Sequence, residues 1–144
     1  MNRKDWALFA ISYAGEGHLS PAQLQKSLFL LGENKKSAVR KDFYKFAPYN
    51  YGPFCKDIYS DTGSLEADGL IKFSRPIGRS WVGYSLTGEG KKRIKELKDA
   101  AIADDLKYLS EIIRWVKSIS FKQLLTAIYK EYPKYKINSL FSGV

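Results

Sequence analysis

Residues 46–54 read FAPYNYGPF, which places four aromatic side chains, two prolines and one glycine in nine positions. Each proline fixes its own backbone and disfavours the helical conformation in the residue before it. Gly52 and Pro53 predict a turn from which a helix begins at Pro53, because proline is well tolerated at the first helical position. We interpret the stretch as a structural elbow with two rings in the core, Phe46 and Phe54, and two free to meet a base or a partner, Tyr49 and Tyr51.

Three helices are predicted up to residue 69. Apolar residues at helical spacing predict the first over residues 5–14. Ser20 is a favourable N-cap, so a second helix is predicted over residues 21–32, ending at a glycine. The third is predicted over residues 53–69, where the final glycine suits a left-handed C-cap. Residues 33–53 show neither a helical nor a strand period, and they are long for a loop in so small a domain.

A hairpin and further helices are predicted after residue 69. Residues 70–74 and 81–86 are strand-like and flank a basic turn, which is typical of a β-hairpin. Thr87 is expected to cap a helix over residues 87–101. Helical periodicity then predicts two more helices, over residues 104–117 and 120–132.

Three helices, a hairpin and another helix follow one another in the order of a winged helix-turn-helix. The predicted fold class is therefore α+β, with a three-helix core, a β-hairpin wing and two or three additional C-terminal helices. We assign residues 1–100 to the winged-helix domain and residues 101–144 to a helical extension. The extension is apolar enough either to pack on the same domain or to form the interface of a homodimer.

Two sets of motifs resemble known winged-helix families. Residues 83–97, GYSLTGEGKKRIKEL, resemble the junction between wing and helix in transcription regulators of the PadR and MarR kind. The segments QLQKSLFLLG, YKFAPYNYGPF and LEADGLI together resemble a group of microbial winged-helix proteins related to the Panacea domain of antitoxins. This similarity covers roughly residues 19–97 and extends to EYPKYKINSLF. The resemblance implies the fold, whereas one such scaffold serves DNA, RNA and protein partners alike.

The composition favours a small basic domain over an enzyme or a membrane protein. The 144 residues include 24 Lys and Arg against 15 Asp and Glu, and the formal charge of +9 attracts phosphate backbones or an acidic partner. No apolar run approaches the length of a bilayer span, so we expect a soluble, cytoplasmic protein. One Cys, one His and the absence of a triad or phosphate-loop motif lead us to expect no metal, no cofactor and no catalysis.

Three groups of residues are candidates for nucleic-acid binding. A basic wing tip can reach a phosphate backbone, a basic loop with interleaved aromatic residues can follow one, and the third helix of this fold enters the major groove. Each basic group is also consistent with an ordinary solvated surface. The candidates are Lys72, Arg75 and Arg79 in the wing, Lys35, Lys36, Arg40, Lys41 and Lys45 in the loop, and Lys56 and Ser60 on the helix. We predict non-catalytic, regulatory binding of double-stranded DNA.

The charge of the third helix favours another kind of partner. Between Phe54 and Asp68, one lysine stands against four carboxylates, which the phosphates of a groove would repel. An exposed acidic helix beside tyrosines suits a basic protein, because tyrosine supplies a large contact area at low entropic cost. The alternative function is a protein-binding module, such as an antitoxin or a chaperone-like partner of a toxin, acting through Tyr49, Tyr51, Asp57, Tyr59 and Asp61.

Overall fold

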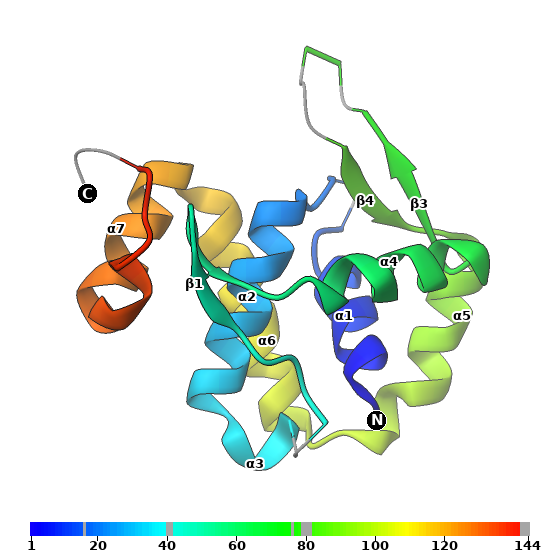
Figure 1. Cartoon of the computed structure of the whole chain (residues 1–144). Helices are drawn as coiled ribbons and strands as arrows, with labels where there is room; N and C mark the ends of the chain where they lie inside the picture. The colour runs from blue at the N-terminus through cyan, green and yellow to red at the C-terminus, as the bar shows by residue number, and fades with distance from the viewer. Residues whose placement is uncertain (16, 40–41, 76, 79–81, 142–144) are drawn as a thin grey trace.

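The computed structural model describes residues 1–15, 17–39, 42–75, 77–78 and 82–141, and it is an α+β chain of packed helices with two small antiparallel hairpins (Figure 1). The helices are α1 (Arg3–Ser12), α2 (Pro21–Asn34), α3 (Lys36–Val39), α4 (Asp57–Ala67), α5 (Gly88–Leu97), α6 (Ala103–Ser118) and α7 (Phe121–Glu131). Short 3-10 helices follow α5 and α7, at η1 (Lys98–Ala100) and η2 (Pro133–Lys136). The hairpins are β1 (Ala47–Tyr49) with β2 (Gly52–Phe54), and β3 (Ile71–Ser74) with β4 (Gly83–Leu86).

Several helices are capped at their N-terminal ends by side chains. Ser20 and Thr87 cap α2 and α5, as the sequence predicts, and each accepts a hydrogen bond from a backbone N–H in the first turn. α1 begins two residues earlier than expected, because Asn2 and Asp5 form a reciprocal capping box. Local side-chain chemistry thus decides where these helices start.

α2 continues past its predicted end at Gly32 and stops at Asn34. Gly32 allows a close approach between elements instead of ending the helix. A Cβ at this position would lie 3.1 Å from the ring of Phe43, so the bare backbone accommodates that ring. Part of the stretch predicted as irregular is therefore helical, and α3 follows after one residue.

The stretch FAPYNYGPF forms a β-hairpin and not the start of a helix. β1 and β2 pair antiparallel with Tyr49 opposite Gly52 and Pro48 opposite Pro53. Two prolines that face each other have no N–H to donate, so the ladder depends on the pairs on either side. The prediction that Pro53 begins the third helix is wrong, because α4 begins at Asp57.

The second hairpin confirms the predicted pair of strands, with the second strand beginning at Gly83, while Trp81, where that strand was predicted to begin, lies outside the described residues. β3 and β4 pair antiparallel, with Ile71 opposite Leu86. Leu19, in the segment between α1 and α2, exchanges two backbone hydrogen bonds with Tyr84 and so attaches this hairpin to the helices. Gly69, with φ of +77°, makes the predicted left-handed turn between α4 and β3.

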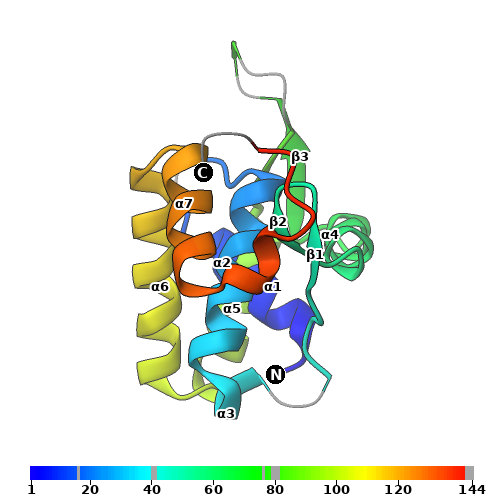
Figure 2. The ribbon, with the colours of Figure 1, turned by 60° about the vertical axis from the view of Figure 1, so that its left-hand side comes forward.

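One hydrophobic core joins the N-terminal and C-terminal helices. α6 packs along α2, and α1 contacts α2, α4, α5 and α6 (Figures 1 and 2). Leu109 and Ile113 of α6 and Leu125 of α7 are fully buried in the same cluster as Leu28 of α2. Within one chain, the C-terminal helices therefore pack on the helices that precede them.

We expect Gly52→Ala to destabilise the fold by about 1–3 kcal/mol, because backbone strain at a positive φ adds to a steric clash with a neighbouring side chain. Gly52 has φ of +89°, and an added Cβ would lie 3.0 Å from Leu125 Cδ2. Urea denaturation measures the loss. Gly69→Ala is the matched control, since it has φ of +77° and no atom within 4 Å of the added Cβ. An equal loss in both variants would contradict a role for the contact with α7.

Candidate functional site

The acidic side chains at the start of α4 are paired within the chain. Arg3 Nη1 lies 3.2 Å from Asp57 Oδ2, and Arg3 Nε lies 3.0 Å from Asp61 Oδ2. The Tyr44 hydroxyl donates to the same oxygen of Asp61 at 2.6 Å. The Arg3 guanidinium also lies 5.1 Å from the centre of the Tyr44 ring. One arginine thus connects α1, α4 and the segment before β1.

This cluster changes the surface that α4 presents. Asp61 is only 8% exposed and Asp57 is half-buried, so they do not form the open acidic face expected for a basic partner. Glu66 and Asp68 are exposed at the other end of α4. Burial, and then the hydrogen bond to Asp61, raise the pKa of Tyr44, which keeps its hydroxyl a donor.

The basic candidates differ in their surroundings. Lys35 forms ion pairs with Asp104 at 3.4 Å and with Asp105 at 3.8 Å. Its positive charge is therefore compensated by carboxylates of the same chain. The other described candidates are exposed, namely Lys36 and Lys45 around the loop, Lys56 and Ser60 at α4, and Lys72 and Arg75 in the wing. Arg40, Lys41 and Arg79 lie outside the described residues.

The wing and α3 lie at opposite ends of the molecule. The β3–β4 hairpin stands at the top of Figure 1, whereas α3, which carries Lys36, is at the bottom. Figure 2 is turned about the vertical axis and keeps the same separation. α4 lies between them and leads directly into β3. The wing and α4 therefore form a continuous candidate surface, to which α3 does not belong.

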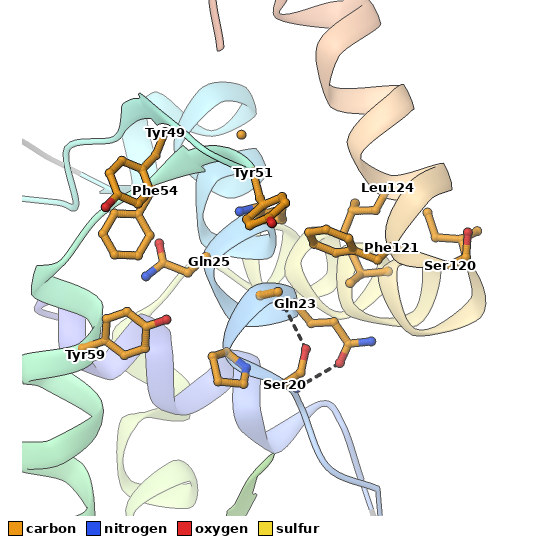
Figure 3. A pocket seen from close by; sticks show the side chains of 16 residues that line it. Ser20, Gln23, Gln25, Tyr49, Tyr51, Phe54, Tyr59, Ser120, Phe121 and Leu124 are labelled. Atoms are coloured by element: carbon orange, nitrogen blue, oxygen red, sulfur yellow. Dashed lines mark hydrogen bonds between the residues drawn. The ribbon is translucent and has the colours of Figure 1, made fainter. Parts of the chain in front are cut away.

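The three candidate tyrosines for partner binding converge on one pocket of about 790 Å³, which we call the aromatic pocket (Figure 3). It lies between the β1–β2 hairpin and the starts of α2 and α7. Its lining consists of Ser20, Pro21, Ala22, Gln23, Gln25, Lys26, Tyr49, Tyr51, Gly52, Phe54, Tyr59, Val116, Ile119, Ser120, Phe121 and Leu124.

Aromatic rings form two walls of this pocket. On one side, Phe54 stacks on Tyr49 with ring centres 5.0 Å apart and contacts Tyr59 at 5.7 Å. On the other side, Tyr51 meets Phe121 edge to face at 6.0 Å. Figure 3 shows the two groups of rings facing each other across Gln25. A planar apolar group fits between such walls.

Two polar residues of α2, Gln25 and Lys26, belong to the lining of the pocket. The Gln25 amide donates to the Cys55 carbonyl and accepts from the Cys55 N–H, both at 2.9 Å. Lys26 is 4% exposed, and its ammonium donates to the Pro53 carbonyl at 3.2 Å. Among the described residues, no carboxylate lies within 4.0 Å of this ammonium. Burial lowers the pKa of Lys26 to about 8.

Sequence reasoning missed Gln25, Lys26 and Phe121. The leucines of α2 predict one apolar stripe, but every residue of α2 from Leu24 to Phe29 is buried. No local pattern marks the polar pair as internal, because its partners, Pro53 and Cys55, lie in β2 and directly after it, about 30 positions along the chain. Phe121 belongs to the predicted apolar extension, and it is 37% exposed in the pocket lining.

The sequence matches no protein-family model and no curated protein. The resemblance to PadR, MarR and Panacea-related proteins therefore stays a prediction. Across the described ranges, no helix is long and apolar enough to cross a membrane.

We expect Tyr44→Phe to lower the free energy of unfolding by about 1–2 kcal/mol, because it removes a short hydrogen bond to the buried carboxylate of Asp61. Denaturant unfolding measures the effect. Tyr49→Phe removes a hydroxyl from a ring that is 53% exposed, so this control should change stability by less than about 0.5 kcal/mol. Similar losses in the two variants would rule out a special contribution from the Asp61 contact.

Lys26 should make stability depend on pH. Its folded pKa of about 8 is below its ordinary value of 10.5, so the unfolded chain binds the proton more tightly and stability rises with pH in this range. Relative to Lys26→Met, the wild type should gain about 2 kcal/mol between about pH 7 and about pH 9.5. Comparing the two proteins cancels the titration of the tyrosines. A difference that stays constant with pH would contradict burial of the charged form.

Proposed function

We propose that the chain is a winged-helix domain that binds double-stranded DNA without catalysis and serves a regulatory role. The contact surface would comprise the exposed face of α4 and the β3–β4 hairpin. In this assignment α1, α2 and α4 are the three core helices, the hairpin is the wing, and α4 is the helix that faces the major groove.

The attachment of the hairpin supports this assignment of elements. The Leu19–Tyr84 bridge adds an extended residue beside β4, and α4 runs into β3 through Gly69. The hairpin therefore projects from the same side of the domain as the end of α4 (Figure 1). A helix and a wing that adjoin in this way can contact a groove and the neighbouring phosphates together.

The observation that carries the proposal is the pairing of Asp57 and Asp61 with Arg3. Counted along the sequence, α4 is too acidic for DNA, but within the chain these two carboxylates share the positive charge of Arg3, and one of them is buried. Lys4 also reaches α4, where its ammonium donates to Ser64 Oγ at 3.0 Å. Around the N-terminal half of α4, Arg3, Lys4 and Lys56 carry three positive charges against the two negative charges of Asp57 and Asp61, a formal balance of +1. Lys56 and Ser60 are exposed there.

The same pairing gives less support to the alternative. A module that captures a basic toxin through Asp57 and Asp61 would have to break their ion pairs with Arg3 and expose a buried carboxylate. The tyrosines of that hypothesis line a pocket with a buried cation, which is a poor match for a basic partner. DNA binding therefore remains the better-supported function.

Duplex binding across a salt series tests the proposal. A protein that neutralises several phosphates gives a steep negative slope of log affinity against log salt concentration. The double variant Lys56→Ala, Lys72→Ala should weaken binding and reduce that slope by about 2, because each lost phosphate contact reduces it by about 1.

The matched control is the double variant Lys36→Ala, Lys45→Ala, which removes the same charge outside the proposed surface. Its slope should change by less than about 1. Equal effects of the two double variants would show attraction by overall charge without a defined surface. Absence of duplex binding at low salt would contradict DNA binding altogether.

A further inference from the structure

The proposed DNA contact makes no use of the aromatic pocket. Its volume of about 790 Å³ lies within the range of small-molecule sites, which is about 300–1,000 Å³. Two ring walls, with Tyr49, Phe54 and Tyr59 on one side and Tyr51 and Phe121 on the other, leave room for an apolar body between them. The shape and the lining both suit a small organic ligand.

The charge in the lining is of one sign. Lys26 is the one charged side chain among the described residues that form the pocket, and only 4% of its surface is exposed. An ammonium has three N–H donors, and the Pro53 carbonyl accepts one of them. A buried cation without a carboxylate partner is costly, and an anion brought into the pocket would relieve that cost.

Two helices begin at the rim and add to the positive potential. Ser20 and Pro21 open α2, and Ser120 and Phe121 open α7, all in the pocket lining. The N-terminal end of a helix carries a partial positive charge that favours a nearby anion. Lysine and helix ends thus act in the same direction.

We propose that the aromatic pocket binds a small aromatic carboxylate. The carboxylate pairs with the Lys26 ammonium, and the ring lies between the two walls. A single negative charge matches the single ammonium, whereas a phosphate dianion would keep uncompensated charge in an apolar site. A neutral aromatic compound would leave the lysine unpaired. The carboxylate therefore provides the selectivity, and the ring provides the contact area.

Cinnamate and its neutral amide, cinnamamide, are a matched pair of probes. Isothermal titration calorimetry on the full chain without DNA gives both affinities, and two-dimensional NMR of backbone amides locates the site. We expect cinnamate to bind at least about tenfold more tightly than cinnamamide, because only the carboxylate brings a negative charge that forms an ion pair with Lys26. The amide signals of Gly52 and Phe121, which line the pocket, should shift on binding.

Lys26→Met removes the cation and keeps an unbranched side chain that is one atom shorter. It should weaken cinnamate at least about tenfold and leave cinnamamide nearly unchanged, so that the preference for the anion disappears. Lys130→Met removes an exposed lysine of α7 outside the pocket lining and should preserve both affinities. Phe121→Ala shortens one wall and should weaken both probes together, which keeps the proposal testable even if Lys26→Met does not fold.

Three results would overturn the proposal. They are equal affinity of the wild type for the two probes, retention of the anion preference in a folded Lys26→Met, and NMR shifts confined to residues away from the pocket. Absence of binding by either probe at about 1 mM, a concentration that detects even weak affinity, would also overturn it. Because DNA takes no part in these measurements, each outcome leaves the proposed function to its own test.

Discussion

Two polar side chains of α2 hold the β1–β2 hairpin in place, and much of the structure depends on them. Gln25 satisfies both backbone groups of Cys55, and Lys26 donates to the carbonyl of Pro53. Within the described part of the chain, these backbone groups belong to a short segment that has no further strand beside it, and buried backbone groups need partners. The same contacts set the point from which the chain enters α4, and both side chains line the aromatic pocket.

The lysine in this arrangement carries an energetic cost. Desolvation of an ammonium is unfavourable, and a single neutral carbonyl compensates for only part of it. A methionine at the same position would fill similar space without that cost, although the carbonyl of Pro53 would lose its partner. Destabilising polar groups of this kind concentrate where a protein binds something, since binding sites retain charges that a purely structural core would exclude.

Much of the fold could be predicted from signals between neighbouring residues. The features that depend on contacts between distant residues could not. Ser20 and Thr87 predicted helix starts because capping depends on neighbours within one turn. The β1–β2 hairpin was missed because Pro53 also suits a helix start. The extended conformation is favoured by Gln25, which bonds the backbone of Cys55 and lies 30 positions earlier, in α2. The pairing of Arg3 with Asp57 and Asp61 spans 54 and 58 positions, so counting charges along α4 misjudged its surface.

The turn of the β1–β2 hairpin is also tied to the far end of the chain. The Leu140 N–H donates to the Asn50 carbonyl at 2.8 Å, and the Asn138 amide donates to the Pro48 carbonyl at 3.4 Å. During synthesis, the hairpin therefore leaves the ribosome about ninety residues before these partners, and loop closure over that distance is slow compared with local helix formation. The first four helices can assemble while translation continues, but the segment that joins α3 to α4 acquires its final partners only after residues 138–140 have emerged.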